Sequence, residues 1–138
     1  MKTELTTLIQ KVIVPATPEE VYEAFVDPKK HSKFTGAKAT GKAEVGAKFT
    51  AWDGYIFGKF LAFEPAKCLA QEWQTTEWPE GYPPSKFELT FKAVPGGSEV
   101  TMTHSNIPKE QEEELAEGWE EWYWTPLKEY FKKRKKTK

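Results

Sequence analysis

Cysteine and long apolar runs are nearly absent from this chain of 138 residues. The single cysteine, Cys68, excludes an internal disulfide and is typical of a reducing compartment, so we expect a cytoplasmic protein. The chain does not begin with a basic end followed by an apolar stretch of ~7–15 residues, and it contains no run of ~18 apolar residues to span a bilayer. The sequence therefore predicts neither export nor a membrane partner.

An excess of charge of one sign is also missing, because 20 basic and 21 acidic side chains leave a formal net charge of −1. This balance gives no overall attraction to nucleic acid. Arg134 is the only arginine, so the body of the chain has no guanidinium that could hold a phosphate through two hydrogen bonds. Because no glycine-rich phosphate loop occurs either, we expect no nucleotide cofactor and no nucleic-acid partner.

Histidine is scarce, which limits metal and catalytic chemistry. His31 and His104 stand far apart, and no HExxH or paired-cysteine pattern occurs, so we expect no metal site. His31 follows two lysines and is predicted to be exposed, whereas His104 shares a strand face with Val100 and Met102. We predict that His104 is a satisfied buried histidine or, alternatively, a ligand contact. No serine, cysteine or carboxylate stands beside it in a recognisable catalytic spacing, so no enzyme activity is predicted.

Aromatic side chains, by contrast, are abundant. They make up 14% of the chain, and six of them are Trp. Rings of this size build an interior from few but bulky side chains. Such an interior either leaves a pocket between the rings or is simply filled by them, and the composition leaves both interpretations open.

The first part of the chain predicts one strand followed by two helices. Residues Leu5–Val14 have the composition of a strand that ends at a proline. Thr17 and Glu20 then form the Thr-x-x-Glu pattern of a capping box, which predicts that a helix begins there. The helix should end before Pro28, because the residue that precedes a proline avoids helical geometry. A short second helix is predicted over residues 29–34.

Hairpin-linked strands are predicted between residues 49 and 104, where apolar and polar residues alternate. Asp53-Gly54 has the composition of a two-residue hairpin turn, and this explains Asp53 better than a catalytic role does. Lys59 indicates which residues of its strand face inward, namely Ile56, Gly58 and Phe60. The later strands cover 69–75, 87–93 and 100–104, and their dry faces are Phe87, Leu89, Phe91 and Ala93 and then Val100, Met102 and His104.

A helix of about six turns is predicted over residues 108–131. Its acidic start and basic end complement the helix dipole or, alternatively, dock a charged partner. Pro126 should bend this helix, and Gly118 would let a neighbouring element approach closely. These two residues either shape a cavity or simply let the helix curve around the sheet. The predicted buried stripe consists of Leu115, Trp119, Trp122, Tyr123, Leu127 and Tyr130.

Strands that are separate from helices indicate an α+β fold. We expect a single domain over residues 1–138, in which a curved antiparallel sheet of six to seven strands packs around the long C-terminal helix. The two short helices should follow the first strand.

Several motifs in this order resemble a known family, the carboxy-terminal domain of the activator of heat-shock protein 90 ATPase. This family is a branch of the START-like (SRPBCC) superfamily, whose helix-grip fold agrees with the predicted elements. The resemblance covers nearly the whole chain. The motifs that carry it are Thr17–Phe25, Asp53-Gly54, the Glu64-Pro65 turn followed by Trp73, the Trp78-Pro79-Glu80-Gly81 loop, Ile107-Pro108, and Gly118-Trp119 through Tyr123.

The resemblance implies a co-chaperone-like domain that binds heat-shock protein 90 and modulates its ATPase. Full-length activators of this family carry a separate amino-terminal domain with an asparagine-rich tryptophan-histidine motif, and nothing similar precedes Leu5. Since two linked contacts gain affinity through effective concentration, we expect this chain alone to bind weakly and to stimulate little.

Two functions therefore stay open. A co-chaperone-like domain would contact its partner through the aromatic, proline-rich loop at Trp78, Glu80 and Tyr82. A carrier or sensor would hold a small apolar ligand between the last helix and the sheet. The candidate lining residues for that ligand are Phe60, Trp73, Leu89, Phe91, Met102, His104, Trp119, Trp122 and Tyr123.

Overall fold

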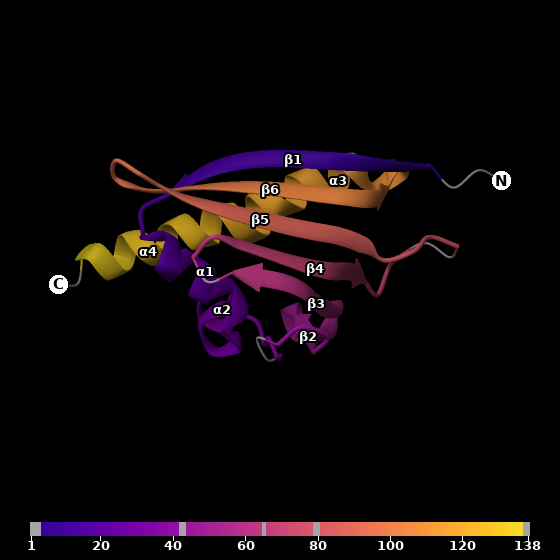
Figure 1. The fold of residues 1–138 in the computed structure, drawn as a ribbon, viewed down its shortest axis with the longest axis horizontal. Coiled ribbons are helices and arrows are strands. Elements are labelled where there is room, and N and C mark those ends of the chain that lie inside the picture. The colour runs from indigo at the N-terminus through magenta and orange to yellow at the C-terminus, as the bar shows by residue number, and fades with distance from the viewer. Residues whose placement is uncertain (1–3, 42–43, 65, 79–80, 137–138) are drawn as a thin grey trace.

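The computed structural model describes residues 4–41, 44–64, 66–78 and 81–136. Within these residues, six antiparallel strands form one sheet in the order β1-β6-β5-β4-β3-β2, with a helical segment behind it (Figure 1). The structure thus confirms the predicted α+β fold. The strands are β1 (Leu5–Val14), β2 (Lys48–Ala51), β3 (Ile56–Glu64), β4 (Cys68–Thr75), β5 (Ser85–Val94) and β6 (Gly97–Pro108).

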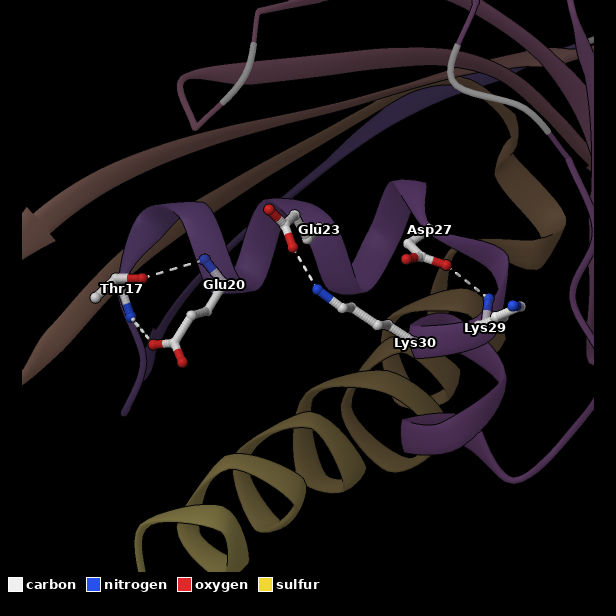
Figure 2. A network of polar contacts seen from close by, with 6 residues as sticks. All are labelled: Thr17, Glu20, Glu23, Asp27, Lys29 and Lys30. Carbon is white, nitrogen blue, oxygen red and sulfur yellow. Dashed lines mark hydrogen bonds and ion pairs between the residues drawn. The ribbon is translucent and has the colours of Figure 1, made fainter.

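The two short helices after β1 begin and end at local signals. Helix α1 (Pro18–Val26) starts with the predicted capping box: Thr17 Oγ1 accepts from the Glu20 amide at 3.1 Å, and Glu20 Oε1 accepts from the Thr17 amide at 2.9 Å (Figure 2). Helix α2 (Pro28–Thr35) is capped by Asp27, whose Oδ1 accepts from the Lys29 amide at 2.9 Å. Because these signals act within a few residues, the sequence predicted both helices.

The hairpin between β2 and β3 is confirmed, but its turn differs from the prediction. Its last strand pair is Ala51 with Ile56, so four residues form the loop instead of the predicted two. Trp52, Asp53 and Gly54 have φ values of 54°, 57° and 93°, a short left-handed run that directs Trp52 out of the ladder. Asp53 is held in this turn because its Oδ1 accepts from the Lys38 amide at 3.0 Å.

The core lies between the sheet and the helices. The predicted inward faces are confirmed for β3 at Ile56 and Phe60, while Lys59 is exposed. On β5 and β6 the predicted faces are buried, except that Ala93 near the hairpin is exposed. The buried residues of these two faces are Phe87, Leu89, Phe91, Val100, Met102 and His104.

The C-terminal helical segment has three parts behind the sheet: α3 (Glu112–Trp119), a π-helical turn labelled η3 (Glu120–Trp124), and α4 (Thr125–Lys136) (Figure 1). In the π turn the Thr125 amide donates to the Glu120 carbonyl, five residues back. The wide turn comes directly before Pro126, which has no N–H to continue the α-helical ladder. A bend was predicted at Pro126, and the structure has a π turn directly before it.

The π turn changes which side chains of this segment are buried. Trp122, predicted to be buried, is 53% exposed, and Leu115 and Tyr130 are only half-buried. A π turn inserts one extra residue, which rotates the side chains that follow it, such as Tyr130, about the axis relative to a regular helix. Leu115 precedes the turn and is not affected by it, and Trp119, Tyr123 and Leu127 are buried as predicted. The stripe that the structure buries is Trp119, Tyr123, Trp124, Leu127 and Phe131.

No helix of the described residues is long and apolar enough to cross a membrane.

Candidate functional site

A cavity of about 420 Å³ lies between the C-terminal helical segment and the end of the sheet near β3 and β4, and it opens to solvent. We call it the aromatic cavity, because four Trp and two Tyr side chains contribute to its wall. The described residues that line it are Trp52, Tyr55, Ile56, Trp73, Thr75, Glu77, Gln111, Glu114, Leu115, Gly118, Trp119, Trp122 and Tyr123.

Strand pairing brings the sheet side of this wall together. Ile56 at the start of β3 pairs with Thr75 at the end of β4, and the Thr76 amide donates to the Tyr55 carbonyl at 2.9 Å. The β2–β3 turn and the residues that follow β4 therefore lie side by side. Because Trp52 has left the β2 ladder, its ring reaches the helix and lies 5.7 Å from that of Trp122.

Gly118 forms part of the helix side of the cavity. We predicted that Gly118 would let another element approach closely, and this is wrong. The nearest heavy atom to the position that a Cβ would take is Trp122 Cδ1, at 3.9 Å. The missing side chain thus leaves space in the wall instead of admitting a neighbouring backbone.

The structure places four of the nine predicted ligand residues at the cavity and five away from it. Trp73, Trp119, Trp122 and Tyr123 line the aromatic cavity. Four others are buried in the core and do not line it: Leu89, Phe91, Met102 and His104. Phe60 borders a separate void of about 20 Å³, which has room for about one water molecule. A ligand role for any of the nine stays a prediction.

Sequence reasoning offered Gly118 as a residue that shapes a cavity, and Gly118 does line it. The other eight lining residues were missed, and some of them had a usable signal. Ile56 and Thr75 are the ends of two strands that were both predicted, so their pairing could have been inferred. Glu114 was interpreted only as part of a charged helix start, and Trp52 as a strand residue. The remaining four are Tyr55, Glu77, Gln111 and Leu115.

His104 is fully buried behind the cavity wall, in a chain of hydrogen bonds that fixes its tautomer. Trp119 Nε1 is only a donor, so His104 Nδ1 accepts from it at 3.2 Å and Nε2 carries the proton. Nε2 then donates to Ser85 Oγ at 2.7 Å, and Ser85 Oγ donates to the Trp73 carbonyl at 2.6 Å. The structure confirms the predicted satisfied, buried histidine.

The Ser85–His104 pair superficially resembles a nucleophile with its base, a proximity that sequence spacing did not reveal. The serine proton, however, points at the Trp73 carbonyl and not at the imidazole, whose Nε2 already carries a proton. A general base requires the opposite arrangement. Burial also lowers the pKa of His104 to about 3, so the ring stays neutral. The pair therefore holds two residues of the cavity wall in place, Trp73 through Ser85 and Trp119 through His104.

His31 was predicted to be exposed, and this is wrong. Its ring is buried against Phe25, Phe34 and Tyr123. Nδ1 lies 3.4 Å from the Phe25 carbonyl and Nε2 lies 3.1 Å from the Tyr123 hydroxyl, which suits donation by Nδ1 and acceptance by Nε2. Burial lowers the pKa of His31 to about 4, with a smaller opposite effect of the Phe25 carbonyl. The prediction of exposure came from the two lysines that precede His31. Neighbouring residues of a helix point in different directions, so the lysines do not indicate which way His31 points.

The mouth of the aromatic cavity carries two carboxylates. The Tyr55 hydroxyl donates to Glu77 Oε1 at 2.7 Å, which fixes that carboxylate, and Glu114 contributes the second from α3. Burial raises the pKa of Tyr55, and the hydrogen bond to Glu77 and the charges of Glu77 and Glu114 raise it further. Over the described residues, no group of three or more His, Cys, Asp or Glu side chains is arranged to hold a metal ion.

The loop predicted to bind a partner is anchored at one end. Trp78 is half-buried, its ring lies 6.0 Å from that of Trp73, and its Nε1 donates to the Pro83 carbonyl at 2.9 Å. Tyr82 is also half-buried. Glu80 lies outside the described residues. Partner binding by these three residues stays a prediction.

Comparison with known proteins places the chain among relatives of similar sequence. The profile of the family "Activator of Hsp90 ATPase homolog 1-like protein" matches residues 15–132. The chain is 35% identical, over 115 residues, to the activator of 90 kDa heat shock protein ATPase homolog 1 of Homo sapiens, which covers 83% of this chain and 34% of that protein. The Dictyostelium discoideum homologue is 30% identical over 115 residues, or 82% of this chain and 30% of that protein. The chain thus spans about a third of the length of these relatives.

Solved structures show the same fold. An HSP90 activator from Plasmodium falciparum superimposes with a TM-score of 0.77 at 23% identity, over 92% of this chain and 95% of that one. CalU16 from Micromonospora echinospora gives a TM-score of 0.73 at 24% identity, over 92% of this chain and 73% of that one. The profile match extends over most of the chain, and the chain therefore belongs to the family of activator of Hsp90 ATPase homolog 1-like proteins.

Proposed function

We propose that this protein binds a small, largely apolar molecule in the aromatic cavity. The observation that carries the proposal is the cavity itself: about 420 Å³, open to solvent, with aromatic side chains as six of its thirteen described lining residues. Ligand sites in proteins have volumes of roughly 300–1,000 Å³ and mostly apolar walls with a few polar groups. A wall made of Trp and Tyr offers a large apolar area with few rotatable bonds.

The wall is held in place before any ligand arrives. Trp119 stacks on Phe87 with ring centroids 4.8 Å apart and planes 3° apart, and its indole nitrogen is bonded to His104. Tyr123 is fixed at the other side by its hydrogen bond with His31. Because these rings are already ordered, a ligand would not lose affinity in ordering them.

Filling the cavity at Gly118 tests this function. A Cβ there makes only an ordinary contact, with Trp122 Cδ1 at 3.9 Å, and leucine improves the helix propensity by up to about 1 kcal/mol. We expect Gly118→Leu to keep or raise the melting temperature while it weakens binding of a neutral apolar fluorophore, N-phenyl-1-naphthylamine, about ten-fold. Gly118→Ala is the matched control, since it gains helix propensity but fills little space. Equal binding by all three proteins would contradict the proposal.

A second candidate is binding to a heat-shock protein 90-type chaperone, supported by the 35% identity with the human ATPase activator homologue. The geometry changes which loop residue should carry the contact. Trp78 is tied to Pro83 and packs on Trp73, so a partner could not engage its whole ring without breaking these contacts. Among the described residues no hydrogen bond or ring contact holds the Tyr82 side chain, and we expect it to contribute more to the partner surface.

Titration of isotope-labelled protein with heat-shock protein 90 from the same source tests this candidate. Localised shifts of the amide signals from Trp78 to Tyr82 that weaken in Tyr82→Ala would support it. The absence of shifts at high partner concentration would contradict chaperone binding and leave the cavity proposal unaffected.

A further inference from the structure

We propose that the ligand of the aromatic cavity is a lipophilic cation, an apolar molecule that carries an ammonium group at the cavity mouth. This inference rests on the proposed ligand-binding function and specifies its chemical class. It follows from the aromatic walls, the carboxylates at the mouth and the lack of any basic group in the described lining.

The charged side chains of the lining all have the same sign. Glu77 and Glu114 are both acidic, and the thirteen lining residues include no Lys, Arg or His. No ion pair engages either carboxylate within the part of the chain that the structure describes. Both carboxylates line the cavity together with Tyr55, whose hydroxyl donates to Glu77 at 2.7 Å. Burial is the main cause that raises the pKa of Tyr55, and the charges of Glu77 and Glu114 act in the same direction.

Glu77 is positioned to accept from a ligand. The Tyr55 hydroxyl donates to Oε1 at 2.7 Å, which orders the carboxylate and leaves Oε2 available. The backbone carbonyl of Glu77 accepts from Gln111 Nε2 at 3.4 Å, which links this residue to the start of the helical segment. An ordered carboxylate on the rim of an apolar cavity attracts a cation more strongly than one that is free in water.

The aromatic rings add attraction for the same charge. Trp52 is nearly perpendicular to Trp122 and to Tyr123, with interplanar angles of 76° and 77° and centroid distances of 5.7 and 6.2 Å. Rings at right angles form a corner, and the electron-rich face of a Trp ring attracts an ammonium group within about 6 Å. Cages of this kind are a known way to bind quaternary ammonium groups.

The helix dipole opposes this preference but is outweighed. Glu114 lies in the first turn of α3, where the helix terminus contributes roughly half a positive charge. Glu112 and Glu113 lie in the same turn, so three carboxylates face that partial charge. The local field thus remains negative. A fatty-acid anion would meet two carboxylates at the mouth and no cation in the described lining.

Three probes with the same eight-carbon chain test the inference: octyltrimethylammonium, octanol and octanoate. Binding is followed by Trp fluorescence and by calorimetry in low salt. We expect the cation to bind about ten-fold more tightly than the alcohol, and the anion to bind most weakly. The advantage of the cation should shrink as salt is added, because the mouth is exposed.

Neutral variants locate the charge effect. Glu77→Gln and Glu114→Gln should each reduce the affinity for octyltrimethylammonium several-fold and leave octanol unchanged. Glu113→Gln is the matched control, since it removes a carboxylate from the same helical turn but not from the cavity lining.

The outcomes separate this inference from the proposed function. Equal affinities for the cation and the alcohol, or tightest binding of octanoate, would overturn the cation preference while the cavity remained a ligand site. Failure of all three probes and of the neutral fluorophore would overturn the proposed function itself. An equal loss of affinity in Glu113→Gln would show that the helix charge in general, and not the mouth, attracts the cation.

Discussion

The surroundings of Trp119 include a closely packed region and an open cavity. Trp119 stacks on Phe87 and bonds to His104, in a region where every buried polar side-chain atom that the structure describes has a partner. We call this part of the core the sealed region. Trp119 also lines the aromatic cavity, together with Trp73 and Tyr123. An aromatic-rich composition can therefore build both a closed core and an open site between one sheet and one helical segment.

The difference arises from the position of hydrogen-bond partners. In the sealed region Ser85 and His104 reach from neighbouring strands and join backbone, imidazole and indole in one chain. Around the cavity, Trp52 and Trp122 lie on a turn and on a π turn, and no side chain fills the place at Gly118. A regular strand and a regular helix would have directed these rings elsewhere.

Truncation of Trp119 should have the largest effect on stability, because this ring belongs both to the sealed region and to the cavity wall. Trp119→Ala would leave a large void beside Phe87 and would remove the donor to His104 Nδ1. We expect a loss of about 3–5 kcal/mol in the free energy of unfolding, measured by urea denaturation. A loss below about 1 kcal/mol would show that the sealed region is not packed as described.

Mild acid should affect the sealed region next, through its buried neutral histidines. Burial lowers the pKa of His31 to about 4 and of His104 to about 3, below the ordinary value of 6.5 in the unfolded chain. Between pH 7.5 and 5.5 the unfolded state therefore binds more protons than the native state, so stability falls as the pH falls. From this linkage we expect a total loss of about 3 kcal/mol at pH 5.5.

The matching direct measurement is a proton NMR titration of the two imidazole rings. Their signals in the folded protein should keep the positions of the neutral form down to pH 5.5. Movement of either signal with a midpoint near pH 6.5 would show that the ring is accessible to water and is not part of the sealed region.

The contrast between the sealed region and the cavity also explains what the sequence could predict. The capping box at Thr17 and Glu20 and the inward face of β3 depend on neighbours in the chain, and both predictions were confirmed. The exposure of Trp122 depends on a π turn, and the burial of His31 depends on Tyr123, which is 92 residues away. Such features need the tertiary structure.

The cavity was the least predictable feature for the same reason. Its wall combines a left-handed turn, the ends of two strands and a helix with one extra residue in a turn. Each departs from the regular periodicity that a sequence pattern reveals. The sealed region, in contrast, follows regular strand alternation at Phe87, Leu89, Met102 and His104, and its buried face was predicted.

Removal of the Trp122 side chain should have the smallest effect on stability. It tests whether a ring of the open cavity can be removed without destabilising the sealed region. The Trp122 side chain is 53% exposed, so Trp122→Ala should cost less than about 1 kcal/mol in the free energy of unfolding. The same change removes one wall of the corner with Trp52, and we expect it to weaken binding of N-phenyl-1-naphthylamine about ten-fold. Ile9→Ala is a suitable control, because Ile9 is 64% exposed on β1 and does not line the cavity. If Trp122→Ala instead costs as much stability as Trp119→Ala, the ring is part of the core, and the division between a sealed region and an open cavity is wrong.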